Sequence, residues 1–235
     1  LMRNGQSIRR QDWRRCCRGE GHKAPLLAPA VRGANARLKV QRKKILMFQF
    51  PNDFDPQPSL ENDLLVLCPL ARADIDELAM AASDPAIWAG HPARNRYQRD
   101  IFDGYFTVLL NIGGALLVRD RATEDVIGCS AFYTDPSAPS RLSIGFTFLT
   151  CSHWGGSTNK ALKSLMLDHL YKHNSEAWFH IGIHNMRSQA ATMKLGALLA
   201  HEADLDLGGG PQSWRCYCLT RESWKARLLN GDTKI

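Results

Sequence analysis

The hydrophobic pattern of this chain changes its period once, at residues 154–156, and this change restricts the fold more than any other feature. Upstream, short apolar segments are separated by turn residues, which is typical of β-strands joined by tight connections. Downstream, apolar residues recur every three or four positions over 160–171, which predicts an amphipathic helix. A further apolar strand follows over 177–183. The upstream segments predict strands over 115–120, 126–133 and 141–150.

Short turns make the three upstream strands an antiparallel meander, whereas a helix between two neighbouring strands makes those strands parallel. Such a crossover is right-handed. The predicted class is therefore α/β, with a mixed (α+β) sheet built from a meander followed by a strand–helix–strand unit. The other predicted elements are strands over 63–68, 197–206 and 213–220, helices over 71–82, 97–111, 187–195 and 221–229, an extended lead-in over 48–61 and a loop over 86–96.

Charge divides the chain into two parts. Residues 1–46 carry thirteen Lys/Arg and two acidic residues, a net charge of +11, and the other 189 residues carry 17 Lys/Arg and 21 acidic residues, a net charge of −4. We interpret 1–46 as a disordered basic extension and 47–235 as the folded domain. The extension could bind nucleic acid, direct the protein to an organelle, or precede a true start at Met47.

Several classes of protein are disfavoured by composition. The sequence has no apolar run of about 18 residues, as a membrane span requires, and no secretory signal. Its seven cysteines fit no zinc or redox spacing, which favours buried reduced thiols, no metal and a cytoplasmic location. The charge of −4 on the folded part makes nucleic acid an unfavourable partner for that domain. A homodimer is compatible with the sequence.

The stretch 143–168 runs from a strand through a small-residue loop into a helix. A helix start presents free N–H groups and a partial positive charge, which suits a pyrophosphate. Gly155 and Gly156 allow close approach of the main chain. Short polar side chains and one cation follow, namely Ser157, Thr158, Asn159 and Lys160. Neither a Walker motif nor a dinucleotide fingerprint is present, and a purely structural turn would have the same pattern.

Three features in fixed order resemble motifs A and B of the GNAT N-acetyltransferases. They are Ile144-Gly145-Phe146, then Trp154-Gly155-Gly156 before a long helix, and then HIGIHNMRSQAATMKLGA at 180–197. The sequence is most similar to the branch that includes the ribosomal-protein alanine N-acetyltransferases. The resemblance covers residues 60–225 and includes the ending YCLTRESW at 217–224, which is typical of that branch.

This resemblance implies a GNAT-like acyl-CoA N-acyltransferase fold, acetyl-CoA as cosubstrate and a primary amine, such as a protein N-terminus, as acceptor. It places the pyrophosphate on 154–160, where Ser157 replaces the usual glycine and would be strained at positive φ. It assigns the pantetheine arm to Asn185 and to the strand that contains Phe148, Leu149 and Thr150. Backbone N–H groups near Phe148 and Leu149 would polarise the thioester.

The resemblance also suggests residues for proton transfer. Ser188 matches the residue that protonates the leaving thiolate, although both Ser188 and Asn185 could simply cap a helix. Thr192 stands where many family members have a tyrosine that acts as the general acid. The third strand offers no carboxylate as general base, so Glu202 is a candidate by location, as are His180, His184 and His201. A water-relayed path is equally compatible.

The segment between the first two helices lines the acceptor side in this fold. Its aromatic and basic residues, Trp88, His91, Arg96 and Tyr97, could shape a substrate pocket or form a packed loop. Two other functions remain open from the sequence. One is acetylation of a small amine or antibiotic, for which an acidic pocket would indicate a polyamine or aminoglycoside. The other is a non-catalytic module that binds acyl-CoA or nucleic acid.

Overall fold

The computed structural model describes residues 48–135 and 137–229. The basic segment 1–46 lies outside the described residues, as do Met47, Cys16 and Cys17. The interpretations of that segment as a disordered arm, a targeting signal or a stretch before the true start therefore remain predictions. Among the residues described, no helix has the length and apolar character that a membrane crossing requires.

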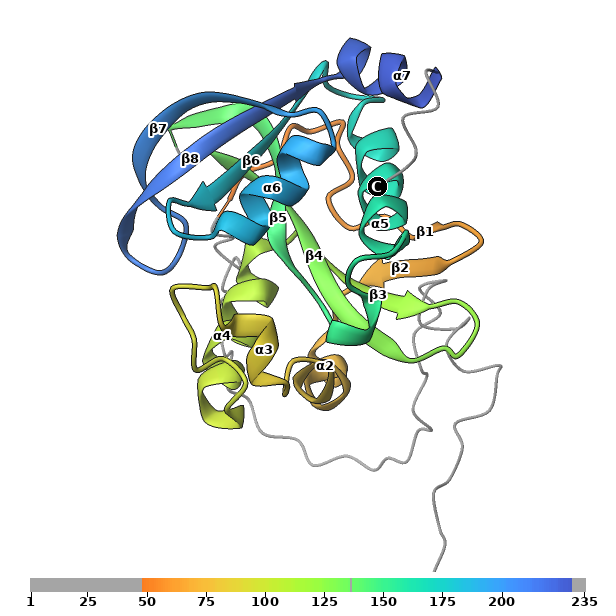
Figure 1. Ribbon diagram of the computed structural model, residues 1–235, viewed down its shortest axis with the longest axis vertical. Helices are drawn as coiled ribbons and strands as arrows, with labels where there is room; N and C mark the ends of the chain where they lie inside the picture. The colour runs from red at the N-terminus through yellow and green to blue at the C-terminus, as the bar shows by residue number, and fades with distance from the viewer. Residues whose placement is uncertain (1–47, 136, 230–235) are drawn as a thin grey trace, which may run out of the picture. The chain divides into compact units, whose positions relative to one another are not determined.

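One sheet of eight strands, in the order β1-β2-β3-β4-β5-β6-β8-β7, forms the centre of the domain (Figure 1). Neighbouring strands are antiparallel except β5 and β6, which are parallel. This confirms the predicted mixed sheet, with a meander followed by a strand–helix–strand unit. The strands are β1 (Leu60–Glu61), β2 (Leu65–Pro69), β3 (Ala115–Asp120), β4 (Val126–Asp135), β5 (Ala138–Leu149), β6 (Glu176–Gly182), β7 (Leu198–Asp206) and β8 (Pro211–Thr220).

The helices agree with the predicted ones except at 85–88 and 151–153, where two short helices form that were not predicted. They are η1 (Arg72–Asp74), α2 (Ile75–Ala81), α3 (Pro85–Trp88), α4 (Arg99–Ile112), η2 (Cys151–His153), α5 (Thr158–Leu170), α6 (Met186–Lys194) and α7 (Arg221–Leu229). The prediction of a loop from residue 86 was wrong at 86–88, where α3 forms. Asp84 accepts a hydrogen bond from Ala86 N (2.9 Å) and Pro85 occupies the first turn. The same Asp-Pro pair that ends α2 thus starts a new helix.

The extended lead-in also contains a strand that the pattern did not predict. Leu60 and Glu61 pair with Leu67 and Val66, and Asn62 Oδ1 accepts hydrogen bonds from Leu64 N and Leu65 N in the turn between them. A two-residue strand has no detectable alternation, so only the asparagine of the turn indicated it.

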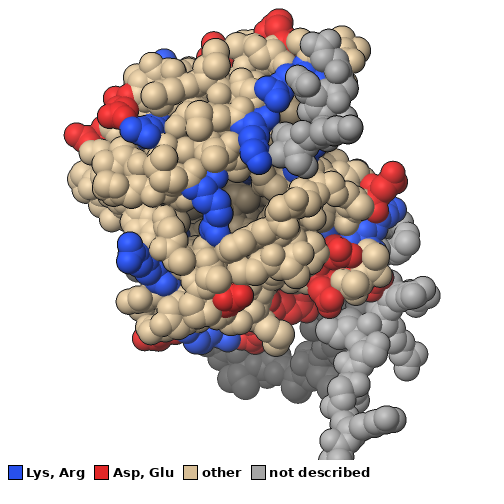
Figure 2. Space-filling view, in the orientation of Figure 1, with Lys and Arg blue, Asp and Glu red and all other residues tan. Residues whose placement is uncertain are grey.

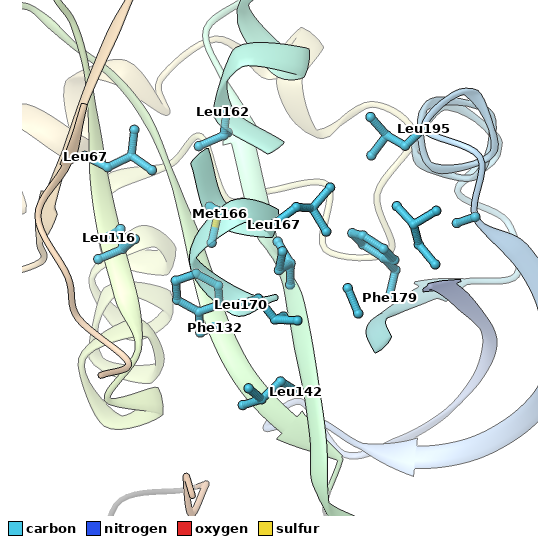
Figure 3. Close-up of a cluster of buried hydrophobic side chains, with 14 of the residues drawn as sticks. Leu67, Leu116, Phe132, Leu142, Leu162, Met166, Leu167, Leu170, Phe179 and Leu195 are labelled. Atoms are coloured by element: carbon cyan, nitrogen blue, oxygen red, sulfur yellow. The ribbon is translucent and has the colours of Figure 1, made fainter. Parts of the chain in front are cut away.

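Helix α5 covers one face of the sheet and supplies the centre of the core (Figure 3). Helices α2 and α4 contribute nothing to this cluster and pack against β3 and β4. They therefore cover the opposite face, and Leu116 and Leu117 of β3 are buried on opposite sides by strand alternation. The cluster around α5 includes Leu67, Phe132, Leu142, Leu162, Met166, Leu167 and Leu170.

A register shift interrupts the pairing of β4 with β5 between Cys129 and Ala131. Gly128 lies just before it with φ +155°, and a Cβ there would stand 2.0 Å from Phe148 O, a backbone atom that has little freedom to move. The close approach of the two strands therefore requires glycine at this position.

We predict that Gly128→Ala lowers the melting temperature strongly, because its methyl group collides with the main chain of β5. Gly104→Ala is the matched control. Gly104 lies in α4 with open space around its Cβ position, so alanine should raise stability by up to about 1 kcal/mol through helix propensity. Thermal unfolding of both variants measures the difference. Equal melting temperatures would show that β4 and β5 can separate at this point.

Candidate active site

Strands β5 and β6 share one paired position, Ser143 with Trp178, and then diverge. The divergence coincides with the bulge in β5. Phe146 has φ +51°, a left-handed conformation that costs a residue with a Cβ about 1 kcal/mol or more. Its carbonyl accepts a hydrogen bond from Tyr105 Oη (3.3 Å), and its ring packs on Tyr133 (5.2 Å between centroids). These contacts hold the strained residue in place.

The Tyr133 side chain stands at the point where the two strands separate. Its ring lies over Gly145, where an added Cβ would be 2.8 Å from Tyr133 Cε1. Its hydroxyl hydrogen-bonds to His180 Nδ1 on β6 at 2.8 Å. A phenol from β4 thus contacts a side chain of β6 at the point where strand pairing ends.

A cleft of about 580 Å³ opens where the strands separate. It extends from α3 and α4 on one side to the loop before α5 and to α6 on the other. Figure 2 shows a hollow near the middle of the face viewed, with Lys and Arg side chains at its edge. A divided parallel pair offers unpaired backbone groups and a passage between strands, which suits an elongated ligand.

Ten of the predicted site residues line this cleft, namely Trp88, His91, Arg96, Phe148, Leu149, Trp154, Gly155, Asn159, Asn185 and Ser188. Five others lie next to it in the same loop and helix start without lining it, namely Thr150, Gly156, Ser157, Thr158 and Lys160. Tyr97 and Glu202 are outside the lining. The structure therefore gathers most of the predicted residues around one cavity, although they span more than 100 positions of sequence.

The loop before α5 has the geometry of an anion site. Gly155 takes the left-handed conformation (φ +72°), and neither Gly155 nor Gly156 has an atom within 4 Å of its Cβ position. Ser157 has φ −75°, so the strain considered for this serine does not arise. Its side chain makes no capping bond, and the helical hydrogen bonds begin with Ala161 N to Ser157 O (2.8 Å). The N–H groups before Ala161 remain available to an anion.

Trp154 and Arg187 connect this loop to α6. The indole Nε1 of Trp154 donates to Leu149 O (2.9 Å), and the Arg187 guanidinium stacks 4.1 Å from the Trp154 ring. Arg187 also donates to Ile87 O (2.8 Å). Arg187 was not among the predicted site residues, because nothing in the local sequence pattern shows that residue 187 lies against residue 154.

The two backbone N–H groups considered for the thioester face opposite edges of β5. Thr150 N donates to Ile127 O of β4 (2.8 Å), and alternate residues of a strand face the same edge. The N–H of Phe148 is therefore directed at β4, and that of Leu149 at the separation from β6. The Leu149 carbonyl, which receives Trp154 Nε1, confirms this orientation.

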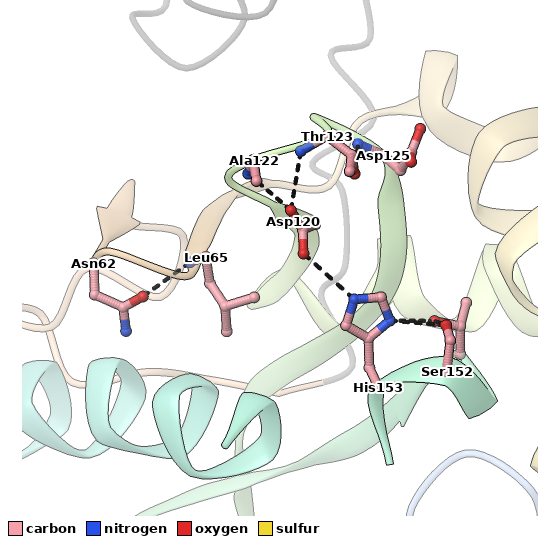
Figure 4. A network of polar contacts seen from close by, with 9 residues as sticks. Asn62, Leu65, Asp120, Ala122, Thr123, Asp125, Ser152 and His153 are labelled. Carbon is pink, nitrogen blue, oxygen red and sulfur yellow. Dashed lines mark hydrogen bonds and ion pairs between the residues drawn. The ribbon is translucent and has the colours of Figure 1, made fainter. Parts of the chain in front are cut away.

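His153 fixes the loop on the hairpin between β3 and β4 (Figure 4). Its Nδ1 lies 2.8 Å from Thr150 Oγ1, and its Nε2 lies 3.4 Å from Asp120 Oδ2. Asp120 Oδ1 accepts hydrogen bonds from Thr123 N and Ala122 N, and these bonds hold the pKa of its carboxyl below the ordinary value. Thr150 therefore has a positioning contact with His153.

The acceptor side contains a stack of aromatic and basic side chains. The Arg96 guanidinium lies 3.9 Å from the Tyr105 ring and 5.6 Å from the Trp88 ring, and Trp88 packs on Phe148 (5.2 Å). His91 Nδ1 accepts from Ala93 N (2.9 Å). Burial, together with the charges of Arg96 and Arg187, lowers the pKa of His91 to about 4, so the ring is neutral at pH 7.

Asn185 and Ser188 differ in their roles at the start of α6. Asn185 Oδ1 accepts from Ser188 N (3.2 Å), so Asn185 is the N-cap. The Ser188 hydroxyl lines the cleft, and within the described residues it makes no hydrogen bond. The prediction that both residues could act as caps is thus met by Asn185 alone.

Glu202 lies on β7, where its carboxylate pairs with Arg215 (2.9 Å) and its side chain is 58% exposed. His184 and His201 are also outside the lining, and His201 is exposed. Of the four candidates for the base, only His180 lines the cleft.

Lys163 is a buried lysine that was not among the predicted site residues. It projects from α5, and its Nζ donates to Thr147 Oγ1 (2.8 Å) beside the bulge. Burial lowers its pKa to about 7. The sequence did contain a sign that Lys163 is buried, because it lies three and four positions before Met166 and Leu167 on the apolar face of α5.

His180 is held neutral inside the sheet. The Tyr133 hydroxyl hydrogen-bonds to Nδ1 at 2.8 Å. The other ring nitrogen, Nε2, has no hydrogen-bond partner within the described residues and lies 3.8 Å from Asp135 Oδ2. Burial lowers the pKa of His180 to about 4; Asp135 opposes the shift, whereas His201 and Arg141 add to it. Among the residues described, no group of His, Cys, Asp or Glu side chains is arranged to hold a metal.

The depressed pKa of His180 predicts a pH-dependent stability. Between pH 6.5, the ordinary value, and about 4, the unfolded chain binds a proton at His180 that the folded chain excludes. Stability should therefore fall as the pH is lowered through this window, by about 1.4 kcal/mol per pH unit for each such histidine. Urea unfolding from pH 7 to 4 should show a smaller slope for His180→Gln. His201→Gln is the exposed control, and an equal slope in both variants would contradict the buried neutral state.

Comparison with known proteins agrees with this arrangement. A family model described as the acetyltransferase (GNAT) domain matches residues 65–198, more than half of the chain. The search of curated proteins found no match.

Several solved structures share the fold. A GCN5-related N-acetyltransferase from Brucella melitensis aligns with a TM-score of 0.59 at 17% identity, over 77% of this chain and 88% of that one. The acetyltransferase from Agrobacterium tumefaciens str. C58 gives 0.52 at 21%, over 74% and 100%. RimJ from Mycobacterium smegmatis, in complex with CoA-disulfide, gives 0.53 at 14%, over 75% and 94%. At these identities the likeness shows the fold alone.

Proposed function

Because this chain belongs to the GNAT family of acetyltransferases, we propose that it transfers the acetyl group of acetyl-CoA to a primary amine in the cleft between β5 and β6. The observation that carries the proposal is the separation of these strands directly beside a helix start with free N–H groups. The reaction converts an ammonium and acetyl-CoA into an amide, free coenzyme A and one proton. Acetyl-CoA supplies the activated acyl group.

The residues of the loop and of α5 would hold the phosphates. Gly155 and Gly156 leave space for an anion, the N–H groups of Thr158, Asn159 and Lys160 point out of the helix start, and Arg187 adds a cation nearby. The pantetheine arm would then lie along the separated edge of β5, beside Asn185. The Leu149 N–H, directed at the separation, would stabilise negative charge that develops on the thioester oxygen.

Two residues would move protons. Ser188 would protonate the departing thiolate, since its hydroxyl lines the cleft and has no other described partner. His180, rather than Glu202, would receive a proton from the ammonium, directly, through Tyr133 or through water. His180 lines the cleft, and its Nδ1 hydrogen-bonds to the Tyr133 hydroxyl, a group that can relay a proton.

The acceptor suggested by the sequence is a protein N-terminus, as in the ribosomal-protein alanine N-acetyltransferases. The motif resemblance in the sequence supports this acceptor. The second candidate, a polyamine or aminoglycoside, is less well supported, because no Asp or Glu is among the described residues that line the cleft. A screen of amines and peptide N-termini for release of free coenzyme A tests the activity itself. No release with any acceptor would contradict the proposal.

We predict that Gly156→Asp abolishes most acetyl-CoA binding. Its carboxylate would stand where the phosphates approach, and like charges repel at close range. Isothermal titration calorimetry of the folded variant measures the affinity. Gly156→Ala is the matched control, since it adds the Cβ without the charge into open space, and its affinity should change much less. Equal affinities for wild type and Gly156→Asp would exclude this loop as the phosphate site.

Ser188→Ala should lower kcat by about 10²–10⁴-fold, the usual contribution of a general acid. Acetyl-CoA affinity and melting temperature should hardly change, since the capping bond uses Ser188 N, which alanine retains. Asn185→Ala provides the contrast, with a loss of about 1 kcal/mol of stability through the cap. Steady-state kinetics with an acceptor from the screen measure this effect. Wild-type turnover of Ser188→Ala would show that water or the substrate, and not Ser188, protonates the thiolate.

A further inference from the structure

The cleft carries positive charge that no acidic side chain in its described lining balances. The lining contains Arg96, Arg187 and the buried Lys163, whose pKa is lowered to about 7, and among the described lining residues there is no Asp or Glu. Asp135 Oδ2 lies 3.8 Å from His180 Nε2, but Asp135 is not among the lining residues, and its Oδ1 already accepts hydrogen bonds from Ser137 N and Oγ (2.8 and 2.6 Å). An acceptor amine enters as an ammonium, so this environment opposes a substrate whose only charge is positive.

The three basic side chains of the lining differ in the groups that they already contact. Lys163 donates to Thr147 on the α5 side, and Arg187 donates to Ile87 O and stacks on Trp154 near the proposed phosphate loop. Arg96 lies on the α4 side and has no carboxylate partner within the described residues. Its only polar contact there is His91 Nε2 at 3.4 Å.

That contact does not satisfy the guanidinium. His91 is neutral and accepts from Ala93 N at Nδ1, so its ring proton is on Nε2. Two N–H donors therefore face each other at 3.4 Å. In the described part of the chain the donors of Arg96 lack an acceptor, whereas the flat faces of Tyr105 and Trp88 fix the plane of the group. A preoriented guanidinium with free donors is the usual arrangement for bidentate binding of a carboxylate.

The position of Arg96 relates it to the reacting atoms. Tyr105, on which Arg96 lies, donates to Phe146 O at the bulge of β5, and Trp88 packs on Phe148. One side chain, Tyr105 or Trp88, thus separates the guanidinium from the part of β5 beside which the acetyl group would lie.

We infer that Arg96 binds a carboxylate of the acceptor, so that the acceptor is an amine that carries its own carboxylate. This inference rests on the proposed function and narrows its substrate class. A zwitterion brings no net charge into the cationic cleft, and its carboxylate occupies the donors that the protein leaves free. The carboxylate can belong to a free α-amino acid or to an acidic side chain next to a peptide N-terminus.

The test compares acceptors that differ only in the carboxylate. For free amino acids, each acid is compared with its α-amide and with the decarboxylated amine. For peptides, Ala-Glu-Ala-amide is compared with Ala-Gln-Ala-amide. Coenzyme A release gives kcat/KM for each. We expect the carboxylate-bearing member of one set to exceed its carboxylate-free counterpart by about tenfold or more in kcat/KM, the usual effect of a hydrogen bond to a charged group. The α-amide loses its ammonium proton more readily than the acid, so ease of deprotonation cannot produce this preference.

Arg96→Gln should abolish the preference by lowering kcat/KM for the carboxylate member, with little change for the carboxylate-free one. Arg96→Lys, which keeps the charge and loses the planar fork, should retain part of the preference. Acetyl-CoA affinity and melting temperature of both variants show whether the domain is intact. Acetylation of carboxylate-free acceptors at rates equal to the acids would overturn the inference and leave the proposed function standing. Preference that survives Arg96→Gln would also overturn it. Absence of coenzyme A release with every acceptor would contradict both the inference and the proposed function.

Discussion

β5 and β6 run parallel but are paired only at Ser143 and Trp178, and every part of the cleft depends on this early separation. Two neighbouring strands that lose their hydrogen bonds expose donors and acceptors, which is costly unless other groups replace them. In this sheet Trp154 Nε1 donates to Leu149 O, and the Tyr133 hydroxyl on β4 hydrogen-bonds to the ring of His180 on β6. A side chain of the loop thus replaces part of the strand pairing, and the remaining unpaired groups, such as the Leu149 N–H, are left for a ligand.

The separation also explains why glycine and a strained residue lie side by side in β5. Tyr133 can reach β6 only if its ring passes over a residue without a Cβ, and Gly145 meets this requirement. The bulge at Phe146 turns the rest of β5 away from β6, at the cost of a positive φ. Contacts from α4 and β4 compensate for the strain, so helices on the acceptor side and strands of the core are mechanically connected at the site.

The sequence predicted those parts of the site that are encoded locally. The change of hydrophobic period located the strand–helix–strand unit, and Gly155 in the left-handed conformation is the residue that the loop needed. Contacts between segments that are distant in the sequence could not be predicted from local patterns. Nothing near Tyr133 indicates that it meets His180, 47 positions away, and nothing near Arg187 indicates Trp154. Glu202 was selected for its place in the chain, but strand alternation and the pairing with Arg215 direct it to solvent. Arg96 was selected as one of several basic and aromatic residues, and only its stacking on Tyr105 distinguishes it from Tyr97.

The charges of the cleft have a consequence for the end of the reaction. Acetylation converts an ammonium into a neutral amide, so a zwitterionic acceptor becomes an anion while it is bound. Arg96 would then hold a product that is more negative than the substrate, in a described lining without acidic residues. Attraction to the product would rise as the chemistry proceeds, which favours the transfer and opposes departure of the amide. Release would depend on the departure of coenzyme A and on competition by a new acceptor for the guanidinium. Product release, rather than acyl transfer, is therefore the step that this electrostatic arrangement slows.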